Sequence, residues 1–308
     1  MNEAGQREGP RIVSIVLNVA NVARSTAFFV DALGFEPLKS GTREGADFER
    51  LAGVPGGRQS FTRLQLGEQE IELVEFEQAG LPYPLPRAAN DPWFQHFAIV
   101  VSDMAQAYER LCRQSHEPIS IGGPQQLPPS TGSVIAYKFR DPDGHPLELS
   151  FIPSGYWADP ANAPAAGALF LGIDHSAIAV TDVARSVAFY NEQLGFALAS
   201  RGLNEGITQE CLDGLTGAKV DIVVMEGPRG GPHLELLHYR SPQSRRRQKQ
   251  FKLNAIPATR LLVEFPAFRA SHENPSVSAG AALQGDRCVL MVDPDGHRVE
   301  LCQSSADW

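Results

Sequence analysis

The sequence predicts an α+β protein built from four βαβββ modules, and three observations lead to this prediction. The chain has 308 residues, more than one hydrophobic core usually holds, so two similar-sized units are expected. Each half contains an apolar strand, an amphipathic helix and then several strands. The same strand–helix unit begins again in a shorter form inside each half.

An internal repeat relates the two halves. NVARSTAFFVDALGFEPL, from Asn21, aligns without gaps with DVARSVAFYNEQLGFALA, from Asp182, at an offset of 161, and nine of eighteen positions are identical. DPDGHPLELS, from Asp141, matches DPDGHRVELC, from Asp293, at an offset of 152. Because the two repeats occur in the same order, whole halves were duplicated.

Local patterns assign the elements of each unit. The segments IVSIVLNVA and IDHSAIAVT precede the first repeat, and their β-branched content predicts strands. The repeat predicts an amphipathic helix ending at Gly34 or Gly195, where glycine suits a left-handed C-cap. The segments SFTRLQL, EIELVEF, KVDIVVM and HLELLHY alternate or run apolar, as strands do.

The second module of each half follows from FQHFAIVVSDMAQAYERL and from ATRLLVEF, each leading to a strand pair around a DPDGH turn. We therefore expect an N-terminal tail at 1–10 and a Pro-, Ala- and Gly-rich linker at 153–168, anchored by Tyr156 and Trp157. The expected domains and their modules are 11–152, with modules 11–85 and 92–152, and 169–308, with modules 169–242 and 253–304.

Composition limits the classes of partner. A net charge of −9 and a pI near 5.4 argue against nucleic acid, which needs a basic surface. The polar N-terminus and the lack of long apolar runs predict a cytoplasmic protein that contacts no membrane. The cysteines contain no CxxC pair and are expected to be mostly small buried hydrophobes without disulfides: Cys112, Cys211, Cys288 and Cys302.

The motif pair resembles a known family. A strand followed by DxxRSxxFYxxxLGF, and later by DPDGHxxEL, is similar to the vicinal-oxygen-chelate superfamily of glyoxalases, bleomycin-resistance proteins and extradiol dioxygenases. The four modules cover nearly the whole chain. The resemblance implies two curved mixed sheets, each a half-barrel. It leaves the chemistry open, because members include lyases, isomerases, epimerases, dioxygenases, thiol transferases and metal-free binding proteins.

The resemblance also implies candidate metal ligands. In metal-dependent members each module offers one residue, usually His, from its first strand and one Glu from its last strand. The matching first-strand positions are Ser14, His96, His175 and Thr259, and the last-strand positions are Glu72, Glu148, Glu235 and Glu300.

Two pairings of the modules are considered. If each half closes on itself, neither site contains two histidines. If the second and third modules pair across the halves, one complete site results, and the set from the outer modules is degenerate. We favour pairing across the halves, which gives a metal site of His96, Glu148, His175 and Glu235.

This donor set suits one divalent metal ion, either Zn, Ni, Co, Mn or Fe(II). The resemblance then implies a glyoxalase-like lyase or isomerase that acts on a small molecule with vicinal oxygens through a metal-stabilised enediolate, with Glu235 or Glu148 as the base. One alternative is an extradiol-type ring-cleaving dioxygenase, whose single-half ligand triad is interrupted by Ser14 and Thr259. The other is a metal-free binding or resistance protein. Monomer and homodimer both stay open.

Other residues near these motifs have weaker assignments. His233, on the same strand face as Glu235, is expected to contribute to substrate binding, as are Tyr137 and Trp93. His145 and His297 directly follow Asp-Pro-Asp-Gly turns and are expected to be structural. The basic run from Ser244 to Lys252 is interpreted as a solvated loop, with an anion clamp as the alternative.

Overall fold

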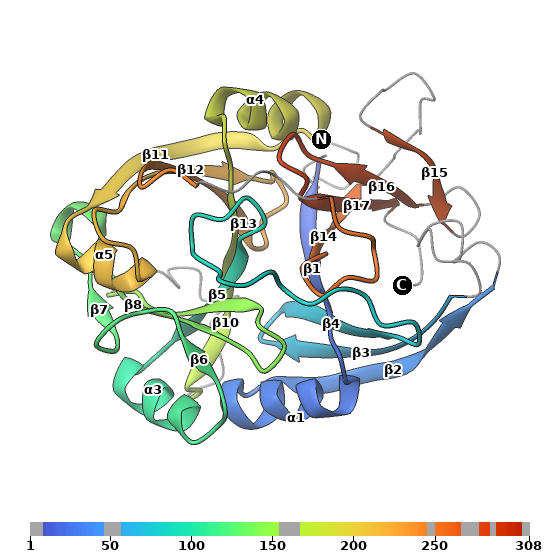
Figure 1. Ribbon diagram of the computed structural model, residues 1–308, viewed down its shortest axis with the longest axis horizontal. Helices are drawn as coiled ribbons and strands as arrows, with labels where there is room; N and C mark the ends of the chain where they lie inside the picture. Colours follow the sequence, from blue (N-terminus) through green and yellow to red (C-terminus); the bar gives the residue numbers. More distant parts are fainter. Residues whose placement is uncertain are drawn as a thin grey trace.

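The computed structural model describes residues 9–45, 57–153, 167–244, 250–265, 277–283 and 288–303. Within them, two open, curved mixed β-sheets lie side by side (Figure 1). The predicted α+β class is confirmed. Residues 1–8 of the predicted tail, residues 154–166 of the predicted linker and residues 245–249 of the basic run lie outside the described residues, so the anchoring role of Tyr156 and Trp157 stays a prediction.

An eight-stranded sheet combines the first module with the fourth, in the order β15-β16-β17-β14-β1-β4-β3-β2. The first module contains β1 (Arg11–Asn18), α1 (Val22–Leu33), β2 (Glu36–Glu44), β3 (Arg58–Leu66) and β4 (Gln69–Phe76). The fourth contains β14 (Arg260–Phe265), β15 (Val277–Leu283), β16 (Cys288–Val292) and β17 (Arg298–Gln303).

A nine-stranded sheet combines the second module with the third, in the order β11-β12-β13-β10-β5-β9-β8-β6, with β7 also paired to β8. The second module contains β5 (Gln95–Val101), α3 (Met104–Cys112), β6 (Glu117–Pro118), β7 (Gln125–Gln126), a 3-10 turn η1 (Pro129–Thr131), β8 (Ile135–Arg140) and β9 (Pro146–Phe151). The third contains β10 (Phe170–Ala179), α4 (Val183–Ala188), a π-helical turn η3 (Phe189–Gln193), β11 (Ala197–Glu205), α5 (Ile207–Asp213), β12 (Lys219–Glu226) and β13 (His233–Ser241).

The modules pair across the halves of the chain. The first strands of the paired modules meet as antiparallel neighbours, β1 with β14 and β5 with β10. Within each module the first strand runs parallel to the last one. The pairing that we favoured is therefore confirmed, and closure of each half on itself is wrong. The domain boundaries stay a prediction, because each sheet contains strands from both halves.

The predicted helix ends are present in the structure. The Asn21 side chain caps α1 by accepting a hydrogen bond from the Arg24 backbone, and Gly34 ends the helix with a φ of 72°. Gly195 has a similar φ of 73° after the π-helical turn. Phe29 of α1 is fully buried and stacks on Phe97 of β5, so this helix packs on the main hydrophobic core, to which both sheets contribute.

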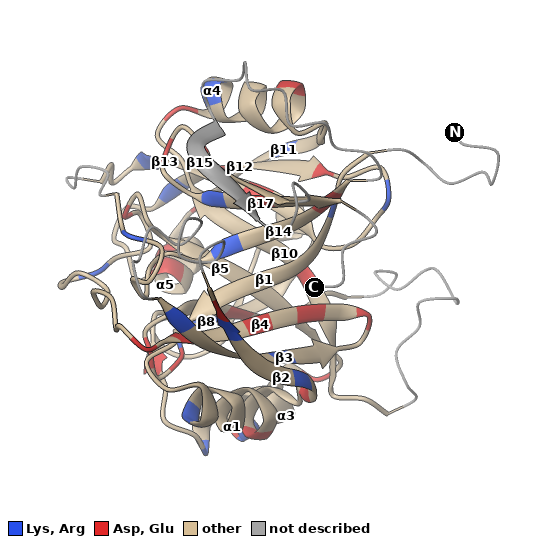
Figure 2. Ribbon diagram, turned by 90° about the vertical axis from the view of Figure 1, so that its right-hand side faces the viewer, with Lys and Arg blue, Asp and Glu red and all other residues tan. Residues whose placement is uncertain are grey.

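Helices α1, α3 and α4 lie at two opposite ends of the molecule. In both views α1 and α3 lie next to each other at one end, and α4 lies at the other (Figure 1, Figure 2). Among the described residues, no helix is long and apolar enough to cross a membrane.

The two repeated motifs of each half contact each other. Asp143, in the first DPDG turn, accepts a hydrogen bond from the Ser25 hydroxyl at 2.8 Å and pairs with Arg24. Asp295, in the second turn, accepts hydrogen bonds from the backbone amide and hydroxyl of Thr181. Each turn therefore holds the start of the first helix in its own half, which explains why the motifs recur together.

The histidines of the DPDG turns are structural, as predicted. Asp141 accepts hydrogen bonds from the backbone amides of Asp143 and His145, and its second oxygen lies 2.9 Å from the His145 ring. The ring of His297 is paired with the carbonyl oxygen of Ala179 at 2.9 Å. Both rings are buried and satisfied at one nitrogen by these contacts.

Two cysteines overturn a sequence expectation. Cys288 and Cys302 form a disulfide between β16 and β17, whereas Cys112 is exposed. The bonded residues are 14 positions apart and show no CxxC spacing. They meet because the strand register places them directly opposite each other, with 4.2 Å between their Cα atoms. The spacing of the two cysteines in the sequence does not reveal this strand register, so the disulfide was not predicted.

Gly34→Ala should destabilise the fold. A Cβ at this position would lie 3.0 Å from Cδ2 of Phe170, and the φ of 72° is unfavourable for alanine. We expect the free energy of unfolding to fall by about 1–2 kcal/mol. Gly202→Ala is the matched control, because a Cβ there meets no atom within 4 Å. Denaturant titrations of both variants test this, and equal shifts of the two midpoints would contradict it.

Candidate functional site

A cavity of about 330 Å³ occupies the concave face of the nine-stranded sheet, here named the central cup. Both modules of that sheet contribute polar residues, which include His96, Lys138, Glu148, Asp174, His175 and Glu235. The walls also include Leu127, Val134, Leu212, Val220, Ile222 and Leu237. A hollow that combines apolar walls with convergent polar groups is the usual form of a small-molecule site.

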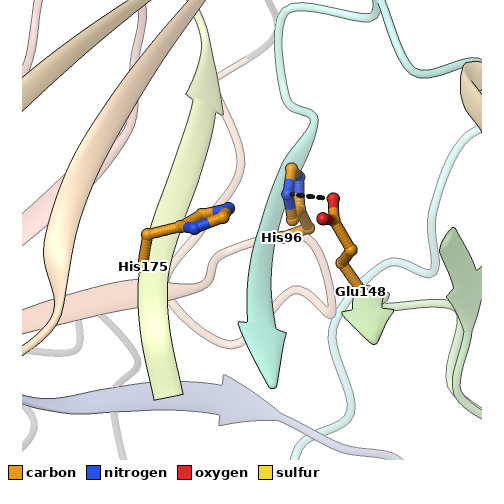
Figure 3. A group of neighbouring side chains, drawn as sticks. All are labelled: His96, Glu148 and His175. Atoms are coloured by element: carbon orange, nitrogen blue, oxygen red, sulfur yellow. Dashed lines mark ion pairs between the residues drawn. The ribbon is translucent and has the colours of Figure 1, made fainter. Parts of the chain in front are cut away.

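The candidate ligands converge in this cup. His96 projects from β5 and His175 from β10, with ring centroids 5.5 Å apart, and Glu148 of β9 points toward His96 (Figure 3). One donor atom from each of these three residues lies within 4.8 Å of the other two. The fourth predicted ligand, Glu235, has its Oε2 at 3.6 Å from Nε2 of His175. All four predicted residues therefore lie together in the fold.

A β-bulge brings an unpredicted carboxylate to His175. The register of β10 against β5 shifts between Ile173 and His175, and such shifts redirect side chains. Asp174 consequently lies beside its neighbour, with its Oδ2 at 2.8 Å from Nδ1 of His175. A carboxylate on one ring nitrogen fixes the tautomer and leaves the other nitrogen free for a ligand, which is common around metal-binding histidines.

The two histidines have opposite electrostatic environments. Burial and the nearby charge of Lys138 lower the pKa of His96. Burial also acts to lower the pKa of His175, but the carboxylates of Glu235 and Asp174 outweigh it and raise that pKa to about 9. Without a metal ion, His175 is therefore protonated at neutral pH, and a metal ion bound there would replace a proton.

Glu148 and Glu235 are both ionised. Burial raises the pKa of Glu148, but contacts with His96 and Lys138 bring it well below its ordinary value. Burial likewise raises the pKa of Glu235, and the charges of His175 and His233 lower it to about 2. Glu148 is held more tightly, because the Ser150 hydroxyl donates a hydrogen bond to it at 2.7 Å.

Lys138 is a site residue that the sequence analysis missed. It lies on β8 directly opposite Glu148, with its Nζ at 3.7 Å from Glu148 Oε2 and 2.7 Å from Oδ1 of the buried Asp213. A signal existed, because Lys138 interrupts the apolar strand segment YKF as Glu148 interrupts LEL. The sequence around Asp213 gave no such signal, because Asp213 reaches Lys138 only through the position of α5 in the folded chain.

The three residues assigned to substrate binding differ in outcome. His233 lies beside the ligand group, with its Nε2 at 3.5 Å from Glu235 Oε1. Tyr137 is buried in the main core, where it stacks on Phe139, because its neighbour Lys138 takes the face that lines the cup. Trp93 packs edge-on against Phe251, away from the central cup. The structure therefore contradicts the positions expected for Tyr137 and Trp93.

The concave face of the eight-stranded sheet corresponds to the central cup and is here named the outer cup. The strand register of this sheet shows that one of the predicted ligand positions, Thr259, was wrong. Leu262 is opposite Glu300, as Ala98 is opposite Glu148. The residue two positions before Leu262 is Arg260, so Arg260, and not Thr259, matches His96. Thr259 precedes β14 and is off the cup by one residue, which turns a side chain to the opposite face of a strand.

Comparison with known sequences identifies the family. The model of the Glyoxalase/Bleomycin resistance protein/Dioxygenase superfamily matches residues 11–149 and 172–301. The chain belongs to this superfamily. Among curated proteins, none matches the chain.

Solved structures share the fold of this superfamily member. Glyoxalase I from Zea mays superposes with a TM-score of 0.57 at 17% identity, covering 96% of this chain and 93% of that one. A candidate dioxygenase from Bacillus subtilis subsp. subtilis str. 168 superposes with a TM-score of 0.58 at 12% identity, covering 98% and 87%. At these identities the likeness concerns the fold alone.

In this superfamily member the outer cup is filled by larger apolar residues and by arginines. Val16 takes the place of Ala177, and Leu262 takes that of Ala98. Arg43 makes two hydrogen bonds of 2.7 Å to the two oxygens of Glu72, and Arg63 adds a third at 3.0 Å. Arginine side chains thus neutralise the carboxylate that corresponds to Glu235 in the central cup.

Glu72→Gln should destabilise the protein in a pH-dependent way. Burial raises the pKa of Glu72, but Arg43 and Arg63 outweigh it and lower that pKa below its ordinary value of 4.5. The stability that Glu72 contributes is therefore present above pH 4.5 and is lost as the pH falls through the lower, folded-state value. We expect the variant to lose about 2–3 kcal/mol at pH 7, with a smaller difference at acidic pH.

Glu44→Gln is the matched control for Glu72→Gln, because Glu44 is an exposed carboxylate that also pairs with an arginine, Arg58, at 3.3 Å. Its stability should match that of the wild type at both pH values. Chemical denaturation at neutral and acidic pH measures these differences. A Glu72→Gln penalty that stays constant as the pH falls would refute the ion-pair assignment.

Proposed function

We propose that the protein is a metal-dependent lyase or isomerase that moves a proton on a small molecule with neighbouring oxygens. The observation that supports this most is the convergence of His96, Glu148 and His175 within 4.8 Å, beside Glu235, in one cavity. Two imidazoles and two carboxylates form a donor set suited to Zn, Ni, Co, Mn or Fe(II).

The residues present fit a divalent cation. His96 lies 3.2 Å from Glu148 without hydrogen-bond alignment, and among the described residues neither of its buried ring nitrogens has a hydrogen-bond partner. A buried, neutral imidazole without a partner is unfavourable unless its lone pair binds something. The neighbouring carboxylates favour a cation as that ligand, because buried negative charge requires compensation.

Each residue has a distinct role in this proposal. His96, Glu148, His175 and Glu235 would hold the ion, which supplies Lewis-acid polarisation of a substrate oxygen. Asp174 orients His175 from behind. Glu148 is fixed by Ser150, whereas the contacts of Glu235 with His175 and His233 are 3.5–3.6 Å long. Glu235 is therefore the carboxylate better able to move and accept a proton.

The metal site is tested by the metal content of purified protein. The wild type should bind about one divalent ion per chain after reconstitution, and the His96→Ala, His175→Ala double variant should bind none, because half of the donor set is removed. His238→Ala is the matched control, since His238 lies on the same strand as Glu235 but pairs with Asp221 outside the central cup. Elemental analysis gives the ratios. A wild type that binds no ion would instead support a metal-free binding protein.

Glu235→Gln tests the proton-transfer step. Hydroxyacetone is a suitable probe, because exchange of its C–H hydrogens in D₂O reports proton removal next to a carbonyl. We expect the enzyme-dependent exchange rate to fall about 100-fold or more in Glu235→Gln. Glu226→Gln, an exposed carboxylate on β12, should exchange at the wild-type rate. Proton NMR measures both rates, and equal rates in the two variants would exclude Glu235 as the base.

A dioxygenase is the second candidate, and one observation favours it. His96, Glu148 and His175 form a group of two histidines and one carboxylate, which is the ligand set of non-haem Fe(II) oxygenases. This triad is assembled from two halves of the chain and not from one. Oxygen consumption by iron-loaded protein with a catechol separates this candidate from the lyase or isomerase.

A further inference from the structure

The central cup contains a buried cation that the proposed metal chemistry does not use. Lys138 is only 5% exposed, yet it lines the cavity next to Glu148. Its Nζ lies 2.7 Å from Oδ1 of Asp213 and 3.7 Å from Oε2 of Glu148, so two carboxylates accompany the ammonium. A buried ammonium is unfavourable unless its surroundings compensate it.

Lys138 has hydrogen-bonding capacity to spare. An ammonium carries three N–H donors. Within the described part of the chain, its one hydrogen bond is to Asp213 at 2.7 Å, and the Glu148 oxygen, at 3.7 Å, is beyond hydrogen-bond reach. Two donors therefore remain for a ligand in the cavity. Because an ammonium only donates, the ligand atom that it binds must be an acceptor, such as a carbonyl or carboxylate oxygen.

The position of Lys138 is fixed by the third module. Gln209 and Tyr239 donate hydrogen bonds of 2.7 Å and 3.1 Å to Asp213, which itself does not line the cavity. Ser120 links the two modules by accepting from the Lys138 backbone amide and donating to the Leu212 carbonyl. The ammonium is thus held in place before any ligand arrives, which favours binding.

The cavity lining offers two cations to a ligand carboxylate. Arg201 lines the cavity together with Lys138. A carboxylate beside Lys138 would also form a charge-assisted hydrogen bond, which is stronger than a neutral one.

Part of the lining can hold the body of the ligand. Leu127, Val134, Val220, Ile222 and Leu237 are apolar, and the cavity volume is about 330 Å³. These residues favour a compact apolar group, while Ser130, Thr131, Ser200 and Asn204 add polar groups to the same lining.

Building on the proposed metal site, we propose that the central cup binds a small 2-oxo or 2-hydroxy carboxylate with an apolar side chain, in which Lys138 holds one carboxylate oxygen while the adjacent oxygens face His96, Glu148, His175 and Glu235. Lys138 then determines the preference for an acid over a neutral carbonyl compound.

The test uses the full chain loaded with its metal and two probes, phenylglyoxylate and its neutral methyl ester. The wild type should bind the carboxylate at least about 10-fold more tightly than the ester. Lys138→Met should remove most of this preference, because affinity falls far more for the carboxylate than for the ester, and the metal content of the variant is measured alongside. Lys219→Met is the matched control, because Lys219 pairs with Glu205 at an exposed position of β12, and it should keep the wild-type ratio. Titration calorimetry and elemental analysis give these values.

Lys138→Met leaves the buried carboxylate of Asp213 without its ion-pair partner, so a second variant is needed. Where Lys138→Met alone does not fold, the Lys138→Met, Asp213→Asn double variant removes both charges and is measured in the same way. A metal-loaded variant that keeps the wild-type carboxylate-to-ester ratio overturns this inference alone, as does a metal-loaded wild type that binds neither probe. A wild type that binds no metal overturns the proposed function, and with it this inference.

Discussion

The antiparallel pairing of β5 with β10 is the constraint on which the central cup depends. Its register places Ala98 opposite His175 and His96 opposite Ala177. The histidines thus share one face, and the alanines leave the space between them open. A slip by one residue would turn each histidine to the other face of the sheet. The parallel neighbours β9 and β13 add Glu148 and Glu235 to this arrangement.

The two cups apply different solutions to the same electrostatic problem. Each sheet buries a pair of glutamates on its concave face. In the outer cup, Arg43 binds Glu72, and Arg260 lies 3.4 Å from Glu300. Arginine side chains therefore balance the charge of both carboxylates. In the central cup, part of the negative charge is balanced by Lys138 and by a protonated His175. An exchangeable proton can give way to a metal ion, whereas a guanidinium cannot.

The sequence predicted the fold and the grouping of His96, Glu148, His175 and Glu235, because repeated motifs and strand parity are local properties of the chain. It failed where the outcome depends on register or on distant packing. Thr259 was chosen in place of Arg260 because a strand start is uncertain by one or two residues. Tyr137 and Trp93 were assigned to the pocket by residue type alone. Asp213 and the Cys288–Cys302 disulfide arise only when separate elements meet.

The order of the strands along the chain has a consequence for biosynthesis. All strands of the nine-stranded sheet come from the continuous stretch 95–241, whereas the eight-stranded sheet joins 11–76 to strands that begin at residue 260. On the ribosome, the sheet that carries the histidines can close while the first module still exposes the unpaired edge of β1. That edge is covered only when the last module is synthesised. All strands of the ligand-binding sheet are therefore synthesised before the antiparallel partner strand of β1 exists.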